Sequence, residues 1–104
     1  MSPRVAIVWS AEALADLTSI HEYIAKTSPR YAAVVAGRLV GAVGRLAQFP
    51  ESGRIVPELG EPSVREVIHG SYRIVYEYRG ERVEVLTVFR ASRLFPGIGS
   101  RSPG

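Results

Sequence analysis

The sequence predicts one α+β domain, in which a helical hairpin packs on one face of an antiparallel sheet. Three observations lead to this prediction. Apolar side chains recur every three or four positions between residues 11 and 49, then alternate within three segments between residues 63 and 90. A segment that contains several prolines and glycines separates the two halves. At 104 residues, the chain is expected to build a single core.

Residues 4–9 are predicted to form a short strand, with the larger side chains on one face, Val5, Ile7 and Trp9. Ser10 suits the N-cap of a helix, because its hydroxyl can accept a hydrogen bond from a backbone amide of the first turn. This helix is expected to end near Thr27. Its apolar stripe is predicted to contain Leu14, Leu17, Ile20, His21 and Ile24.

Ser28 and Pro29 signal a second helix, since proline is favoured at the first helical position. Phe49 and Pro50 should close it. Its buried stripe is predicted to contain Ala32, Val35, Leu39, Ala42 or Val43, and Leu46. Three arginines are expected on another side of this helix: Arg30, Arg38 and Arg45. The short connection makes the two helices an antiparallel hairpin.

Residues 50–62 are predicted to form a loop, and three strands follow at 63–69, 71–78 and 82–90 as an antiparallel meander. In the middle strand, Tyr72, Ile74, Tyr76 and Tyr78 should face away from Arg73, Val75 and Glu77. In the last strand, Val83, Val85, Thr87 and Phe89 should face away from Glu84, Leu86, Val88 and Arg90. Both faces carry apolar side chains, so the face away from the helices is expected to bind a partner.

A single domain is predicted to span residues 1–93, with residues 94–104 as a flexible tail that has no periodic pattern. The chain has no cysteine, which excludes a disulfide scaffold and a thiolate metal site. His21 and His69, the only histidines, have no paired carboxylate motif, so neither a metal nor a cofactor is expected. The apolar segments are too short for a signal or a membrane span, so we expect a cytoplasmic protein without membrane contact.

Arginine makes up twelve of the thirteen basic residues, and the net positive charge falls in residues 62–104, with seven arginines against four glutamates. Arginine binds phosphates and carboxylates in a bidentate manner. The candidates for binding a macromolecular target are Arg65, Arg73, Arg90 and Arg93. Arg73 interrupts an apolar strand and should therefore have a partner. We expect it on the face away from the helices, with Arg65 close enough to share an anionic ligand.

The chain resembles the RelE/ParE superfamily of toxins from Val5 to about Arg93. The features that carry the resemblance are Val8-Trp9-Ser10-Ala11-Glu12-Ala13, Asp16-Leu17, Ile20, Tyr23-Ile24-Ala25, Leu46, Phe49-Pro50, Gly53-Arg54, Val64-Arg65-Glu66, Tyr72-Arg73-Ile74-Val75-Tyr76, and Val85-Leu86-Thr87-Val88. The resemblance implies a toxin that a cognate antitoxin neutralises. The antitoxin would bury exposed apolar side chains of the toxin's sheet, which we expect to include Val75, Leu86 and Val88.

The superfamily contains RelE-like toxins, which cut messenger RNA on the ribosome, and ParE-like toxins, which poison DNA gyrase. Arg73 and Arg93 match two arginines of the RelE-like active site, and Arg65 stands in for one of its two lysines. The second lysine has no counterpart, and the expected C-terminal tyrosine is missing, since no tyrosine follows Tyr78. We therefore expect a ParE-like gyrase poison that is not an enzyme, with a ParD-like antitoxin of the ribbon-helix-helix type. Operator DNA would be bound only through the antitoxin. The alternatives are a RelE-like ribosome-dependent endoribonuclease and a degenerate, non-toxic module that binds the antitoxin and acts with it as a corepressor at operator DNA.

Overall fold

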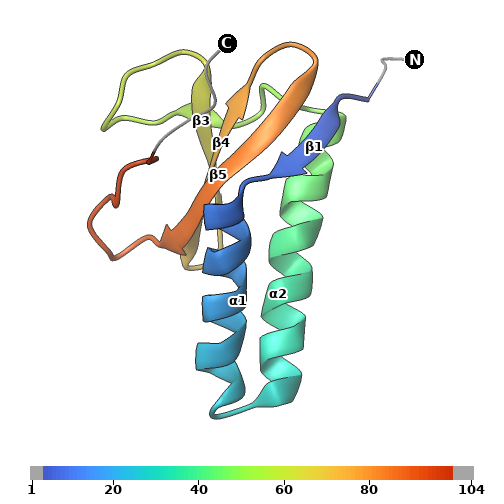
Figure 1. The fold of residues 1–104 in the computed structure, drawn as a ribbon, viewed down its shortest axis with the longest axis vertical. Helices are drawn as coiled ribbons and strands as arrows, with labels where there is room; N and C mark the ends of the chain where they lie inside the picture. The colour runs from blue at the N-terminus through green and yellow to red at the C-terminus, as the bar shows by residue number, and fades with distance from the viewer. Residues whose placement is uncertain (1–3, 100–104) are drawn as a thin grey trace.

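A computed structural model describes residues 4–99 of the chain. Two antiparallel helices pack on one face of a five-stranded mixed sheet (Figure 1). The elements are β1 (Ala6–Trp9), α1 (Ala11–Ala25), α2 (Pro29–Gly44), the 3-10 turn η1 (Arg45–Ala47), β2 (Arg54–Ile55), β3 (Val64–His69), β4 (Tyr72–Tyr78) and β5 (Arg82–Arg90). The strand order is β1-β5-β4-β3-β2; β1 runs parallel to β5 and the other neighbours are antiparallel. The predicted α+β fold class is confirmed, but the sheet is mixed and not antiparallel throughout as predicted, because β1 joins β5 in parallel.

Both helices begin at the serines that the sequence indicated. The Ser10 hydroxyl accepts a hydrogen bond from the Ala13 amide at 3.0 Å, and the Ser28 hydroxyl accepts one from the Tyr31 amide at 3.1 Å. Each cap satisfies an amide that has no partner within its helix. The first helix ends at Ala25, two residues before the predicted end.

The layer between the helices and the sheet contains the larger core. The predicted stripe of α2 and η1 is buried, and both Ala42 and Val43 belong to it. The stripe of α1 is Ala13, Leu17, Ile20 and Ile24 instead of the predicted set. The Leu14 side chain is 50% exposed and His21 is exposed, so these two predictions were wrong. Ala13 is fully buried, because a small side chain lets the start of α1 lie close to β5.

A β-bulge in β5 changes which side chains face the helices. Val75 pairs with Thr87, but its neighbour Tyr76 pairs with Val85, so Leu86 is the extra residue. Such a bulge breaks the alternation of side chains between the two faces. Val88 therefore packs in the helix-side core and Phe89 on the outer side, and the predicted strict alternation along 82–90 was wrong after Leu86.

Side chains of the first helix hold this bulge. One carboxylate oxygen of Asp16 accepts a hydrogen bond from the Thr87 hydroxyl at 2.7 Å and another from the Val88 amide at 2.9 Å. The Ser10 hydroxyl donates to the Leu86 carbonyl at 3.1 Å. The Leu86 carbonyl and the Val88 amide at the bulge thus have side-chain partners, as buried backbone groups require.

The outer face of the sheet is covered by the chain itself. Its second apolar cluster is Val56, Val64, Val75, Leu86 and Phe89, against which Leu59, Phe95 and Ile98 pack. The covering residues come from 50–62 and from 94–99, on either side of the sheet in sequence. Residues 54 and 55 of the predicted loop also form the edge strand β2. The prediction that this face is open to a partner was therefore wrong.

Residues 94–99 have no helix or strand, but they do not extend away from the domain. Phe95 and Ile98 pack on the outer cluster, and the Phe95 ring meets the Phe89 ring edge-on with centroids 5.7 Å apart. The predicted tail thus begins with a packed segment, while residues 100–104 lie outside the described part. Across the described residues, neither helix combines the length and hydropathy needed to cross a bilayer.

Candidate functional site

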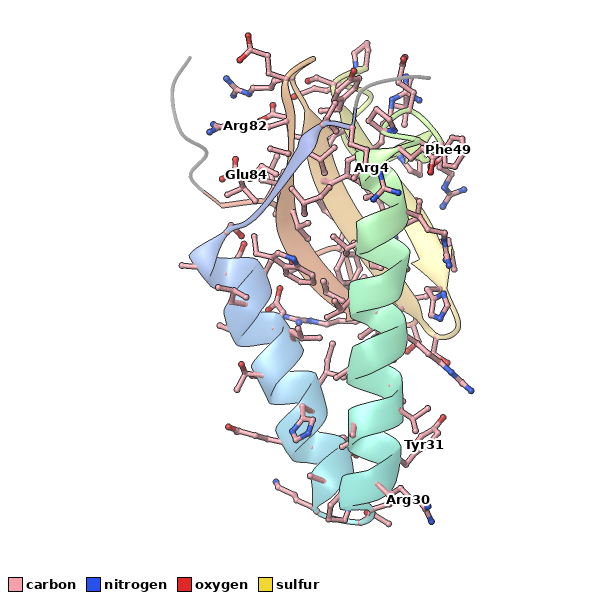
Figure 2. The ribbon with its side chains drawn as sticks, turned by 90° about the vertical axis from the view of Figure 1, so that its right-hand side faces the viewer. Arg4, Arg30, Tyr31, Phe49, Arg82 and Glu84 are labelled. Atoms are coloured by element: carbon pink, nitrogen blue, oxygen red, sulfur yellow. The ribbon has the colours of Figure 1, made fainter. Side chains whose placement is uncertain are left out.

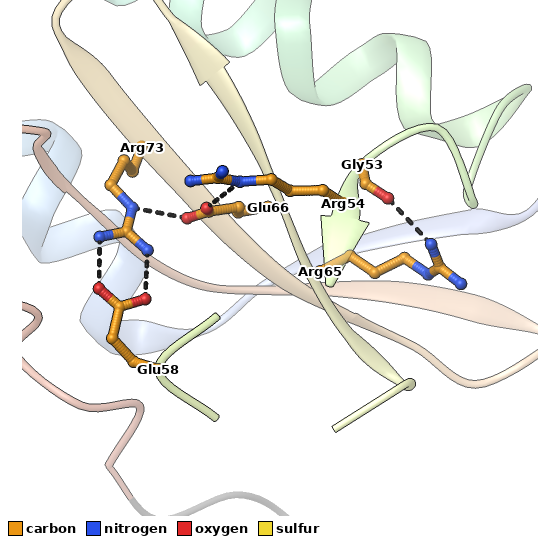
Figure 3. A network of polar contacts seen from close by, with 6 residues as sticks. All are labelled: Gly53, Arg54, Glu58, Arg65, Glu66 and Arg73. Carbon is orange, nitrogen blue, oxygen red and sulfur yellow. Dashed lines mark hydrogen bonds and ion pairs between the residues drawn. The ribbon is translucent and has the colours of Figure 1, made fainter. Parts of the chain in front are cut away.

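The predicted target-binding residue Arg73 lies in a buried ion-pair network on the outer face of the sheet (Figure 3). Its Nε donates to Glu66 at 2.6 Å, and its two terminal nitrogens donate to the two Glu58 carboxylate oxygens at 2.9 and 2.7 Å. Glu66 also accepts a hydrogen bond from Arg54 Nε at 2.7 Å. The Arg73 side chain is 9% exposed and the Glu66 side chain 0%. Arg73 therefore has the partner that its position required.

The surroundings of Arg73 stabilise its positive charge. The Glu58 carboxylate beside it raises the pKa of the guanidinium, and the hydrogen bonds from Arg73 in turn lower the pKa of Glu58 to about 2. The guanidinium carbon also lies 5.0 Å from the centroid of Phe89 and 5.6 Å from that of Phe95. Two carboxylates and two rings thus enclose a charge that would be costly if left unpaired.

The ionised form of Glu58 makes the stability of the domain sensitive to acid. Its pKa is about 2 in the folded chain against 4.5 for the free side chain. Its contribution is therefore complete above pH 4.5 and is lost as the pH falls toward 2. We expect the wild-type melting temperature to fall more steeply over this interval than that of Glu58→Gln, which should melt lower at pH 7. Parallel melting curves of the two proteins from pH 7 to 2 would contradict this role.

Arg65 lies apart from Arg73. Its Nη1 donates to the Gly53 carbonyl at 2.9 Å (Figure 3). In the register of β3 and β4, Arg65 is opposite Tyr76, which packs on the helix side, whereas Glu66 is opposite Val75 on the outer side. Paired residues of two strands share a face. The prediction that Arg65 and Arg73 share an anionic ligand was therefore wrong.

A buried tyrosine ties the loop after α2 to the sheet. The Tyr76 hydroxyl accepts a hydrogen bond from the Gly53 amide at 2.9 Å and donates one to the Pro50 carbonyl at 2.8 Å. Burial raises the pKa of this hydroxyl. Sequence analysis missed this contact. Its signal was a tyrosine at a core position of the central strand, since a buried hydroxyl needs a partner.

The other two predicted arginines, Arg90 and Arg93, line one cavity of about 440 Å³ between α1 and the end of β5. Both are exposed, and the Arg90 guanidinium lies 6.0 Å from the centroid of the Tyr72 ring. The other lining residues are Asp16, Ser19, Ile20, Tyr23, Tyr72, Val88, Phe89 and Ser92. Exposed guanidinium groups beside tyrosines suit a ligand with acidic and apolar parts. We take this cavity as the candidate binding site.

The predicted antitoxin-binding residues are all core residues. Val75 is 0% exposed, Leu86 3% and Val88 2%. Val75 and Leu86 belong to the covered outer cluster, and the bulge turns Val88 toward the helices. None of the three is exposed in the free chain. Within residues 4–99, no three histidine, aspartate or glutamate side chains are grouped as metal ligands.

The family model described as "ParE toxin of type II toxin-antitoxin system, parDE" matches residues 7–95. Toxin RelE2 of Caulobacter vibrioides is 39% identical over 89 residues, which cover 85% of this chain and 97% of that protein. Putative toxin Y4kP of Sinorhizobium fredii is 38% identical over 96 residues, which cover 91% and 97%.

Two solved structures share the fold. One is of the chromosomal ParDE toxin–antitoxin system from P. aeruginosa, with a TM-score of 0.69, 24% identity, and coverage of 86% of this chain and 98% of that one. The other is of the RelBE2 toxin–antitoxin complex from Mycobacterium tuberculosis, with a TM-score of 0.57, 23% identity, and coverage of 84% and 98%. The family match spans nearly the whole described chain, and the two relatives are 39% and 38% identical over most of it, so this protein belongs to the ParE toxin family within the RelE/ParE superfamily.

Proposed function

We propose that this toxin acts on DNA gyrase and not as a nuclease, and that a cognate antitoxin of the ribbon-helix-helix type neutralises it. The observation that supports this most is the state of Arg73, whose guanidinium is bonded to Glu58 and Glu66 and nearly buried. In this arrangement, it has no free face for a scissile phosphate.

The three arginines of a RelE-like active site are also dispersed. Arg73 lies on the outer face, Arg65 on the helix side, and Arg93 at the cavity beyond the end of β5. Cleavage through the ribose 2′-hydroxyl needs a base and an acid whose pKa values lie near the working pH. Glu58 has a pKa of about 2 and is therefore a weak base. The arrangement thus favours binding over RNA cleavage.

We infer that the cavity with Arg90 and Arg93 contacts the target. It is the site where two of the four predicted arginines remain exposed and close together. Tyr23 on its wall is 66% exposed, so a partner would bury apolar area there as well. An antitoxin segment that orders as it binds could cover the same cavity and so prevent target binding.

The test is inhibition of gyrase supercoiling by the purified chain, with cleavage of ribosome-bound messages measured in parallel. We expect supercoiling to be inhibited, messages to stay intact, and an Arg90→Ala/Arg93→Ala variant to inhibit at least tenfold less. Arg82→Ala, which removes an exposed arginine of β5 at the other end of the strand, is the matched control. Induction in cells should trigger a DNA-damage response that the antitoxin suppresses.

The likeness to toxin RelE2 of Caulobacter vibrioides keeps the ribonuclease as the second candidate. Codon-specific cleavage in translating ribosomes, with gyrase unaffected, would establish it in place of our proposal. A chain that inhibits neither process but still binds the antitoxin would identify the non-toxic module instead.

A further inference from the structure

A different surface, formed mainly by α2 and η1, carries exposed arginines that form no ion pair with another described residue. Residues 23–50 contain one lysine, three arginines and no aspartate or glutamate. By contrast, Arg54, Arg73 and Arg79 are in ion pairs with glutamates. The count along the sequence assigned the positive excess to residues 62–104, and four glutamates lie among the arginines of that segment. In contrast, α2 and η1 carry three exposed arginines and no carboxylate side chain.

Three of these charges form one stripe along α2 and η1. Arg30, Arg38 and Arg45 are separated by eight and seven residues, so they lie on the same side of the helix. All three are exposed, and none forms an ion pair with another described residue. The stripe rises roughly 22 Å from first to last arginine, at about 1.5 Å per residue.

A fourth arginine extends the stripe. The Val5 amide donates to the Ala47 carbonyl at 2.9 Å, which anchors the exposed Arg4 beside η1. Figure 2 shows Arg30 and Tyr31 at one end of α2 and Arg4 and Phe49 at the other. We call these four residues, Arg4, Arg30, Arg38 and Arg45, the arginine stripe.

Glycines give the same helix an open backbone. A Cβ atom added to Gly37, Gly41 or Gly44 would meet nothing within 4 Å outside the helix itself. Each glycine in a helix interior costs about 1 kcal/mol relative to alanine, and here no close packing inside the domain requires it. With no side chain beyond Cα, these positions allow a ligand backbone to approach α2 between the arginines.

We propose that the arginine stripe binds the phosphate backbone of duplex DNA. Arginine offers bidentate hydrogen bonds to phosphate, and four such groups, three of them on a helix and turn that contain no aspartate or glutamate, complement a uniformly anionic ligand. The stripe is roughly as long as six base pairs at about 3.4 Å each. Between Arg30 and Arg45 the exposed side chains include Val34 and Val40 but no aromatic beyond Tyr31, so single-stranded bases lack a stacking platform.

This contact would be made directly by the toxin, whereas the sequence predicted DNA contact only through the antitoxin. It uses a surface separate from the cavity at Arg90 and Arg93, so it does not depend on the proposed gyrase site. The two proposals can therefore fail independently.

The test is binding of the purified full chain to a fluorescent 20-base-pair DNA duplex of arbitrary sequence, measured by anisotropy between 50 and 200 mM salt. Each phosphate contact contributes a slope of roughly −0.9 to log K against log salt. Four contacts predict a slope of about −3.6. Arg30→Gln/Arg38→Gln/Arg45→Gln should bind roughly tenfold or more weakly, with a slope near −0.9. Substitution of the same three positions by lysine should largely restore binding.

The charge-matched control is Arg82→Gln/Arg90→Gln/Arg93→Gln, which lowers the net charge by the same amount. Its slope should differ from the wild-type slope by no more than about 0.9, the contribution of one phosphate contact. Circular dichroism melting of each variant verifies the fold. Equal loss in both triple variants would show that only net charge matters and would overturn the proposal. So would the absence of wild-type binding at 50 mM salt, tighter binding of duplex RNA than of DNA, or binding of polyglutamate in preference to either nucleic acid.

Discussion

Replacing Arg73 by alanine is expected to lower the free energy of unfolding by about 3 to 5 kcal/mol. The substitution would leave the buried Glu66 carboxylate, which is 0% exposed, with only the exposed Arg54 as its partner. It would also remove the contact of the guanidinium with Phe89 and Phe95, which covers the outer cluster. Urea unfolding followed by circular dichroism measures the loss.

A second variant separates the ion pair from simple loss of packing. In Arg73→Met/Glu66→Leu both buried charges are removed and apolar volume is kept, so much of the stability should return. Glu58 is 40% exposed and can be solvated in this variant. Arg82→Ala on the surface should change stability by no more than about 0.5 kcal/mol. A stable, fully folded Arg73→Ala protein that has lost only its toxicity would instead make Arg73 a target-binding residue, as the sequence first suggested.

Replacing Gly53 by alanine is expected to cost about 3 kcal/mol of stability. The added Cβ would lie 2.6 Å from the Glu66 carbonyl oxygen, 2.6 Å from the Tyr76 hydroxyl oxygen and 2.9 Å from Cε1 of the same ring. Neither β3, which carries the Glu66 carbonyl and is paired on both sides, nor the buried Tyr76 ring can move away easily. The backbone would have to shift, which would weaken the Gly53–Tyr76 and Tyr76–Pro50 hydrogen bonds.

Gly37→Ala is the matched control, because the same change on α2 meets open space. There the lower conformational freedom of alanine in the unfolded chain should raise stability by about 0.5 to 1 kcal/mol. If the close contact of residue 53 with Tyr76 and Glu66 determines the effect, chemical unfolding should show a lower free energy of unfolding for Gly53→Ala and a higher one for Gly37→Ala. If both substitutions were neutral or both stabilising, the contact between residue 53 and Tyr76 would not be the reason for glycine there.

Local sequence patterns predicted the elements well. Ser10 and Ser28 cap the helices as expected, and the predicted stripe of α2 is buried. The strands at 64–69, 72–78 and 82–90 lie within one residue of their predicted bounds. These features depend on neighbours in the chain, such as a hydroxyl near the first helical amides or a repeat of 3.6 residues.

The predicted functional residues were placed less well. Arg65 and Arg73 are eight positions apart on adjacent antiparallel strands, but the pairing register assigns them to opposite faces. The register depends on where the turn at Gly70 falls and cannot be obtained from composition. Of the four arginines predicted to bind a target, Arg90 and Arg93 line the same cavity beside α1.

The sequence by itself determined the fold class, the helix starts, the order of elements and the need of Arg73 for a partner, because each depends on local spacing or on the cost of an unpaired buried charge. Only the tertiary structure decided that the partners are Glu58 and Glu66, that the bulge at Leu86 turns Val88 inward, and that residues 94–99 cover the outer face. These outcomes depend on contacts between segments distant in sequence, whose relative positions are set by packing of the complete core.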